Sequence, residues 1–378
     1  MTNEQLLTEI TQHRRYFHAH PELGHEEYKT QAYIVAHLTK LGLEYNTVNT
    51  STICDVIVDP SFKMIAMRAD IDALALVEEN ECEYKSTHPG IMHACGHDAH
   101  AAIQLGVISY FMENSEQLKV NIRFIFQCDE ENNGGAKEIC EAGYLNEIAA
   151  IYGLHVDNSL PVGTIGYKYD QMNAGGDEVD ITVKGKQAHG AYPHLGVDSL
   201  VCSANIIMSA QQIVSRQVGP LDSTVVTIGT IEGPGTPNTI CKEVKMRGTI
   251  RNLNPQTRTE TVAQFIKQTK LIGEAMNCEV EVEHEPSYPP LINDNNQVDY
   301  VVANAQSLGY DVYDKKVPSM GLEDFAYYVE LVPGAFVNIG SQIEGDYRNA
   351  HSSRFDFDEN ALLVGALLQI ANAENFGV

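Results

Sequence analysis

The chain has 378 residues, which exceeds the size of one ordinary hydrophobic core and predicts two domains. Its composition is that of a globular protein, with 43% hydrophobic and 20% charged residues. The formal net charge of −26 makes a surface that repels phosphate backbones and anionic membranes. We therefore expect neither a nucleic acid nor a membrane as a partner.

The sequence predicts a cytoplasmic protein. The first 20 residues lack the apolar core of a secretory signal, and no run of about 18 apolar residues is present. Eight cysteines are scattered without paired spacing, which is typical of reduced thiols in a chain of this size.

The first half of the chain alternates between helical and strand patterns. Apolar residues recur at helical spacing in the first 45 residues, on either side of a Pro/Gly loop, and again in 97–111. Short apolar strands are expected at 55–58, 64–68, 120–126 and 149–154, the last ending at His155. This alternation predicts an α/β fold with a mostly parallel sheet.

After about Gly175 the pattern changes to β-α-β-β-α-β, the ferredoxin-like order, which needs only about 110 residues. Its strands are expected at 179–183, 224–231, 244–250 and 278–282, and its helices at 197–217 and 256–276. The α/β pattern then resumes with a helix at 297–308, a strand at 335–339 and a helix at 358–373. We predict a domain at 175–285 inserted into a domain formed by 1–174 and 286–378.

The segment HACGHDAH contains the highest density of potential metal ligands. Cys95 and His97 are two residues apart, so both side chains can reach one ion from a turn, and Gly96 lets the backbone approach closely. A histidine-rich surface loop is the alternative.

Glu130 and Glu131 follow an expected strand, at the edge where α/β sheets place ligands and catalysts. Consecutive side chains point in different directions, so one carboxylate can bind a metal while the other serves as a general base. An acidic pair at this position is otherwise a solvated turn.

His155 and His351 also lie next to expected elements, where a single histidine is usually structural. Together, four segments supply five candidate metal ligands, namely Cys95, His97, Glu131, His155 and His351. Five side chains are too many for one tetrahedral ion and suit two divalent ions that share a bridge, about 3.5–4 Å apart.

The order of HACGHDAH, the Glu-Glu pair, GLHV, KGKQAHGAYPHLGVD, SMGLEDFA and HSSRFDFDE resembles one family over almost the whole chain. It is the amidohydrolase/metallopeptidase family of bacterial aminoacylases, hippurate hydrolases, N-acetyl-diaminopimelate deacetylases and plant auxin-conjugate hydrolases. The resemblance implies a catalytic metal-binding domain with an inserted lid and dimerisation domain.

The same resemblance implies roles for individual residues. Cys95 would bridge two divalent ions, and the other four ligands would complete their shells. Glu130 would be the general base, and Asp72 would orient a ligand. His189 in the inserted domain would reach an active site, often that of the partner subunit.

We expect a homodimer on physical grounds as well, because a ferredoxin-like insert has an edge strand and a helical face free to pair with a copy. The soft thiolate and the borderline imidazole ligands favour zinc, cobalt or nickel as the metal, and manganese remains an alternative.

The sequence departs from the usual family pattern beside the two glutamates. Gln127-Cys128-Asp129 replaces the common Gln-Pro-Ala, and Asn132-Asn133 begins a stretch that is normally rich in glycine. These changes leave the ligands and base intact but alter the pocket wall, and therefore bear on substrate preference.

The expected activity is hydrolysis of the amide bond of small N-acyl amino acids, with N-acetyl amino acids as the favoured substrates. A dipeptidase or carboxypeptidase-like activity is the alternative, and a metal-binding module without catalysis is a third. Candidate groups for the substrate carboxylate are Asn238, Arg251 and the backbone at Gly321. Glu323 and Asp324 are expected to cap the following helix.

Overall fold

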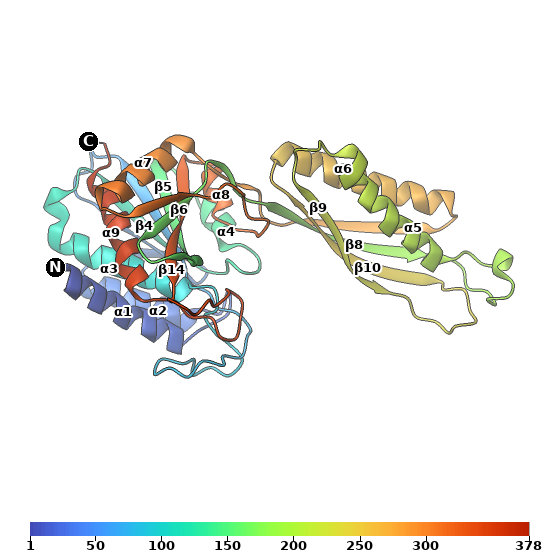
Figure 1. Cartoon of the computed structure of the whole chain (residues 1–378), viewed down its shortest axis with the longest axis horizontal. Helices are drawn as coiled ribbons and strands as arrows, with labels where there is room; N and C mark the ends of the chain where they lie inside the picture. Colours follow the sequence, from blue (N-terminus) through green and yellow to red (C-terminus); the bar gives the residue numbers. More distant parts are fainter. Residues whose placement is uncertain (378) are drawn as a thin grey trace. The chain divides into compact units, whose positions relative to one another are not determined.

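The computed structural model describes residues 1–377, which form two compact units (Figure 1). Unit 1 contains Met1–Met172, Ile292–Val317 and the chain from Asp324 onward. Unit 2 contains Asn173–Leu291 and the short segment Pro318–Glu323. Among the described residues, no helix combines the length and the hydrophobicity that crossing a membrane would need.

Unit 1 is a mixed α/β fold around an eight-stranded, mostly parallel sheet. Its strands, in spatial order, are β1 (Tyr45–Val48), β2 (Ser51–Val56), β4 (Asn121–Gln127), β3 (Met64–Asp70), β5 (Ile148–Pro161), β14 (Gly334–Gln342), β6 (Thr164–Tyr167) and β13 (Asp311–Asp314). The four central strands β4, β3, β5 and β14 are parallel, so their carboxyl ends share one edge. Binding sites of open α/β sheets lie at this edge.

The helices of unit 1 are α1 (Asn3–Ala19), α2 (Tyr28–Lys40), α3 (His97–Asn114), α4 (Gly135–Glu141), α7 (Asn295–Ser307), α8 (Ala326–Val329) and α9 (Asn360–Glu374). Helix α1 begins at a capping box formed by Thr2 and Gln5. Helix α3 is buried along most of its length and contacts α1, α9 and the central strands. At Gly106 a Cβ atom would lie 2.3 Å from Ile10 Cγ1, so glycine permits the close approach of α1 to α3.

Unit 2 has a four-stranded antiparallel sheet in the order β11 (Glu279–Pro286), β8 (Gly175–Lys184), β10 (Glu243–Asn252) and β9 (Thr224–Glu232). Helices α5 (Ser199–Gln212) and α6 (Pro255–Ala275) lie on the same face of it (Figure 1). Asp198 and Asn254 cap their first turns. Alternate residues of β8, such as Val179, Ile181 and Val183, are buried in the core of this unit.

The long regular elements match the sequence prediction within a few residues, whereas short ones were missed. The missed elements are β1, β6, β13, α4, α8 and the pair β7 (Asp170–Asn173) and β12 (Leu291–Asn293). The prediction that a strand ends at His155 was wrong. β5 continues to Pro161 because β14 pairs alongside it beyond His155.

Candidate active site

The turn that presents Cys95 and His97 depends on glycine. Gly96 has φ of +103°, in the left-handed region that glycine favours, and immediately precedes α3. A Cβ atom there would lie 2.3 Å from Val156 Cγ2. The sharp turn therefore places His97 in the first position of α3 and Cys95 just before it.

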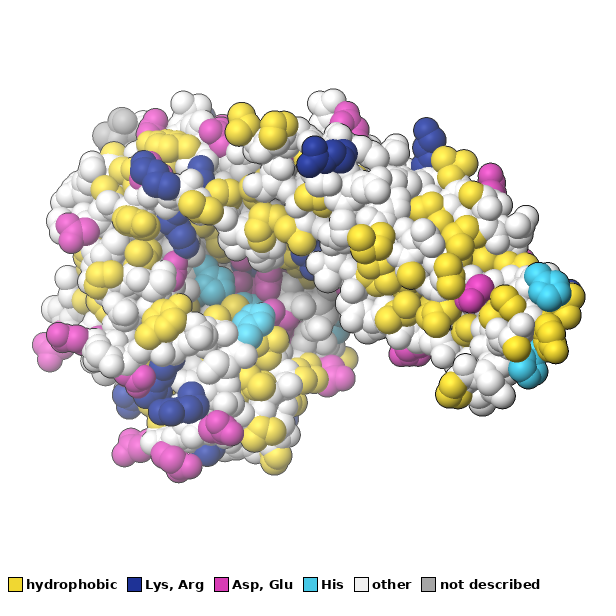
Figure 2. All heavy atoms as spheres, turned by 45° about the vertical axis from the view of Figure 1, so that its right-hand side comes forward, with side chains coloured by type: hydrophobic (Ala, Val, Ile, Leu, Met, Phe, Trp, Pro, Cys, Tyr) yellow, Lys and Arg dark blue, Asp and Glu magenta, His cyan; other side chains and the backbone are white. Residues whose placement is uncertain are grey.

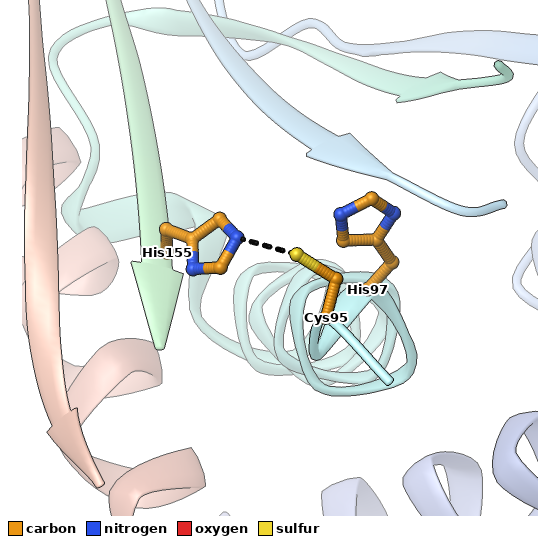
Figure 3. Close-up of side chains that lie close together, drawn as sticks. All are labelled: Cys95, His97 and His155. Atoms are coloured by element: carbon orange, nitrogen blue, oxygen red, sulfur yellow. Dashed lines mark hydrogen bonds between the residues drawn. The ribbon is translucent and has the colours of Figure 1, made fainter. Parts of the chain in front are cut away.

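Three predicted ligands meet at this turn. Sγ of Cys95 lies 3.3 Å from Nε2 of His155 on β5, and the sulfur points between the rings of His155 and His97 (Figure 3). One ligand atom from each of these residues lies within 4.8 Å of the others. A thiol and two imidazoles at this spacing form a donor set suited to a borderline divalent metal.

Cys95 also belongs to a second group, with Glu131 and His351, whose ligand atoms again lie within 4.8 Å of one another. Nε2 of His351 is 3.2 Å from Oε1 of Glu131, which is 3.9 Å from Nε2 of His97. The backbone N–H of His351 donates to the Ala94 carbonyl at 2.7 Å and so fixes its loop beside the turn. The structure thus brings all five predicted ligands into two groups that share Cys95.

Asp72 connects two of the candidate ligands. Its Oδ1 atom lies 3.1 Å from Nδ1 of His97, and its Oδ2 atom accepts the backbone N–H of Glu131 at 3.0 Å. With Nδ1 donating to Asp72, Nε2 of His97 faces the group and would give up its proton on binding a metal. That Nε2 atom is buried and has no hydrogen-bond partner among the described residues.

The electrostatics of the cluster suit a cation. Burial and the Glu131 carboxylate raise the pKa of Cys95 well above its ordinary value. Burial works against the ionisation of Glu131, but the His351 hydrogen bond and the His97 charge outweigh it and lower its pKa. A bound divalent cation would stabilise the Cys95 thiolate and lower the pKa of the thiol, so the residues present fit a metal.

Glu130, next to the ligand candidate Glu131, is 7% exposed. Its charge is a minor cause of the raised pKa of Cys95, after burial and Glu131, so this carboxylate lies near the cluster. Figure 2 shows histidine and acidic side chains gathered on the surface of unit 1.

The other candidate residues belong to unit 2, where they form two pairs. His189 pairs with Thr239 in an isolated bridge, and the Gly190 N–H donates to the Asn238 carbonyl at 2.7 Å, so His189 and Asn238 are neighbours. Arg251 pairs with Gly176 at the other end of the sheet, next to the segment that contains Gly321.

The length of the sheet separates these two pairs. β8 and β10 pair from Gly175 and Asn252 at one end to Lys184 and Glu243 at the other. Ten residues of strand span about 30 Å. A single small substrate therefore cannot contact both pairs on one copy of unit 2.

Sequence reasoning missed a buried network under the cluster. Arg68 donates to Asp70 and to Asp324 at 2.6 Å each, and Asp70 lies 2.6 Å from Nδ1 of His100. The Asp70-Ile71-Asp72 sequence at a strand end was a visible signal for it. Asp324, expected with Glu323 to cap the following helix, accepts the N–H of Ala136 in α4, and the N-cap residue of α8 is Phe325.

The departures from the family pattern are coupled to one another. Asp129 has φ of +50°, and its carboxylate accepts hydrogen bonds from the side chains of Asn132 and Asn133. Its Oδ2 atom also lies 3.0 Å from Nε2 of His25. The Asn132 and Asn133 contacts join the two ends of the stretch 129–133, which carries Glu130 and Glu131.

Relatives of known description span almost the entire chain. An N-acetyl-L-cysteine deacetylase of Bacillus subtilis is 38% identical over 96% of this chain and 86% of the relative. IAA-amino acid hydrolase ILR1-like 5 of Arabidopsis thaliana is 37% identical over 96% and 85%. An N-acetyldiaminopimelate deacetylase of Bacillus licheniformis is 35% identical over 94% and 95%.

Solved structures also resemble this chain over nearly its whole length. A putative aminohydrolase of methicillin-resistant Staphylococcus aureus superimposes with a TM-score of 0.95 at 29% identity, over 99% of this chain and 98% of that one. A Bacillus subtilis protein described as a dinuclear metal-binding peptidase of the M20 family superimposes with a TM-score of 0.85 at 31% identity, over 98% of each chain. The profile of peptidase family M20/M25/M40 matches residues 66–373. The chain therefore belongs to peptidase family M20/M25/M40.

Proposed function

We propose that this protein is a di-metal amidohydrolase that cleaves N-acyl amino acids into a carboxylate and a free amino acid, with N-acetyl amino acids as the preferred substrates. Three of its relatives, from bacteria and a plant, are named for the hydrolysis of N-acetyl or IAA–amino acid conjugates. The observation that carries the proposal is the sharing of Cys95 between two groups of metal ligands.

Two divalent ions would be held by these groups. Cys95, His97 and His155 would hold one ion, and Cys95, Glu131 and His351 would hold the other. The neighbour described as dinuclear supports the number of ions. Bound there, such ions lower the pKa of water and polarise a carbonyl oxygen.

The chain's own residues would move the proton. Glu130 would accept the proton of the attacking water and give it to the leaving amine. Asp72 would hold His97 in the tautomer that leaves Nε2 free, as its 3.1 Å contact with Nδ1 supports. His189 would donate a hydrogen bond to the oxyanion of the tetrahedral intermediate.

Unit 2 would act as a ferredoxin-like lid and dimerisation domain. Its element order and its strand order β11-β8-β10-β9 support that assignment. The separation of His189 from Arg251 by about 30 Å favours a site to which two copies contribute, one offering His189 and Asn238 and the other Arg251 and Gly321.

The surface that we propose for the dimer consists of α5 and the edge strand β9. Leu200, Val201 and Met208 on α5 are 49%, 49% and 68% exposed, and Val225 and Ile231 on β9 are 44% and 47% exposed. Exposed apolar side chains beside an open strand edge favour a symmetric pairing with a second copy. The eight free cysteines support a cytoplasmic location, where thiols stay reduced.

A screen of substrates and metals tests the activity. Metal-free protein is reloaded separately with zinc, manganese, cobalt or nickel and assayed with N-acetyl amino acids beside unblocked dipeptides. We expect hydrolysis of the blocked substrates with at least one metal. Preference for a free α-amine would replace this proposal with the dipeptidase alternative, and metal uptake without any hydrolysis would refute both.

Mixing two inactive variants tests the composite site. We expect Glu130→Gln and His189→Ala to be inactive separately and, after subunit exchange, to recover about a quarter of wild-type activity through heterodimers with one intact site. Recovery requires that His189 act across the dimer. No recovery, with subunit exchange verified by mass spectrometry, would place His189 within its own subunit's site or outside catalysis.

A further inference from the structure

We propose a second metal site, formed by Glu9, His13 and His37 on helices α1 and α2, that takes a zinc-class divalent cation. Glu9 and His13 are four residues apart, on the same face of α1, and His37 lies in the last turn of α2. One ligand atom from each residue lies within 4.8 Å of the others. None of the three belongs to the Cys95 groups.

The distances approach those of a coordination shell. Oε1 of Glu9 lies 3.6 Å from Nε2 of His13 and 3.9 Å from Nε2 of His37. Ligand atoms at about 2.0–2.1 Å from a tetrahedral zinc ion are about 3.4 Å apart. The 3.6 Å and 3.9 Å separations are too long for hydrogen bonds, which would need about 2.7–3.2 Å. A shared zinc ion needs about 3.4 Å between its ligands, so binding a cation requires the smaller side-chain shifts.

His13 is held in the orientation of a ligand. Its Nδ1 atom lies 2.8 Å from the Tyr33 hydroxyl, while its Nε2 atom is buried and without a hydrogen-bond partner among the described residues. The residue is 8% exposed. Metal-bound histidines characteristically use the second ring nitrogen in this way, which fixes the tautomer.

The remaining groups are compatible with a cation. Ser109 donates to Oε1 of Glu9 at 2.6 Å and lies 3.0 Å from Nε2 of His37, so a metal would replace the His37 proton in this contact. Burial lowers the pKa of His37 to about 4, and its imidazole is therefore neutral. Stacking of Tyr16 on Tyr33 at 3.8 Å holds α1 and α2 together.

The cluster opens to a depression of about 520 Å³, which is also lined by Gln12 and Lys40. Two imidazoles and a carboxylate leave a fourth position for water or a small ligand at that opening. The bound cation would link α2 to α1 through its ligands. The alternative is an ordinary ion pair between Glu9 and His13 without metal affinity.

Counting bound zinc tests the site on the full chain. Stripped protein is equilibrated with zinc, freed of weakly bound ions and measured by mass spectrometry for wild type, His13→Gln, His37→Gln and Glu9→Gln. We expect each variant to hold about one zinc ion fewer per chain than wild type, with hydrolysis unchanged. His88→Gln, which removes a histidine outside both clusters, is the matched control and should lose none.

A second measurement, of thermal unfolding, distinguishes loss of the metal site from misfolding of the variants. In chelator, the three variants should unfold at nearly the same temperature as wild type, whereas added zinc should raise the midpoint of wild type more than that of His37→Gln. Equal zinc content in wild type and all three variants would overturn the site. Because the count is a difference, it does not depend on how many ions the Cys95 groups bind.

Discussion

At the scale of single residues, the proposed mechanism assigns metal binding and proton transfer to two adjacent residues. Glu130 and Glu131 are adjacent, and Glu131 has a carboxylate oxygen placed near His97, His351 and Cys95. Neighbouring residues leave a loop in different directions, so one loop can supply a ligand and a base. Substitutions at the two positions should therefore fail in different ways.

Glu130→Gln should abolish proton transfer while keeping the metals. We expect kcat to fall by about three orders of magnitude, within the range of about 10²–10⁴-fold for loss of a general acid–base group, at unchanged metal content. Glu131→Gln is the matched control and should lose metal as well as activity. Turnover near wild type in Glu130→Gln would contradict the assignment of the base.

Asp72→Asn should weaken metal binding. The amide can donate to Nδ1 of His97 and so favour the wrong tautomer, and it accepts the Glu131 N–H less strongly. We expect the metal dissociation constant to rise about 10–100-fold, as measured by competition with a chelator. An unchanged constant would show that His97 is oriented by other contacts.

Glu27 should make the metal-free protein less stable as pH rises. Burial raises its pKa from 4.5 to about 7, although Thr50 and the Asp129 N–H donate to it. Between these two pH values the folded state binds more protons than the unfolded state, so the free energy of unfolding falls with pH. The shift corresponds to up to about 3 kcal/mol.

The comparison of wild type with Glu27→Gln isolates this effect. The amide does not ionise, so the variant should gain stability relative to wild type as pH rises from about 4.5 to 7. Urea unfolding at several pH values measures the difference. A constant difference would mean that Glu27 keeps an ordinary pKa.

At the scale of elements, α1 holds the start of α3, which carries His97. Arg14 is fully buried and donates to Asp98 at 3.0 Å, Asp356 at 2.8 Å and Glu359 at 3.2 Å. Asp98 follows His97 directly in α3. An arginine with three carboxylate partners thus connects α1, α3 and the segment before α9.

Arg14→Ala should destabilise the fold strongly, since it removes the guanidinium from three carboxylates and leaves the buried Asp98 with His18, 2.8 Å away, as its remaining side-chain partner among the described residues. Loss of one partner of a buried pair costs about 3–5 kcal/mol, measurable by urea unfolding. Arg15→Ala is the matched control, because Arg15 is 45% exposed and pairs with Glu359, and it should cost less than about 1 kcal/mol. Equal losses would contradict a special role of the buried arginine.

At the scale of the whole molecule, the proposed dimer depends on the exposed apolar face of α5. Met208→Glu places a charge at its most exposed apolar side chain and should yield a monomer with little activity in analytical ultracentrifugation and hydrolysis assays. Leu271→Glu changes a 52% exposed leucine on α6 and should leave the dimer intact. A fully active Met208→Glu monomer would refute the composite site.

Much of the fold was predictable because its main elements are long and periodic. Helices α3 and α6 and strands β4 and β10 lie within a few residues of their expected bounds. Short elements such as β13 and α8 carry too few residues for a periodic signal. The extension of β5 beyond His155 depends on pairing with β14, which is almost two hundred residues away along the chain.

The sequence by itself determined the family, the α/β pattern and the identities of the candidate ligands, because these depend on residue types, their order and their local spacing. The tertiary structure decided that Cys95 is shared by two groups, that Asp72 contacts His97, and that His189 and Arg251 lie at opposite ends of one sheet. It also brought Glu9 and His13 to His37. Contacts between distant segments depend on how the elements pack, and local patterns of residues do not specify that packing.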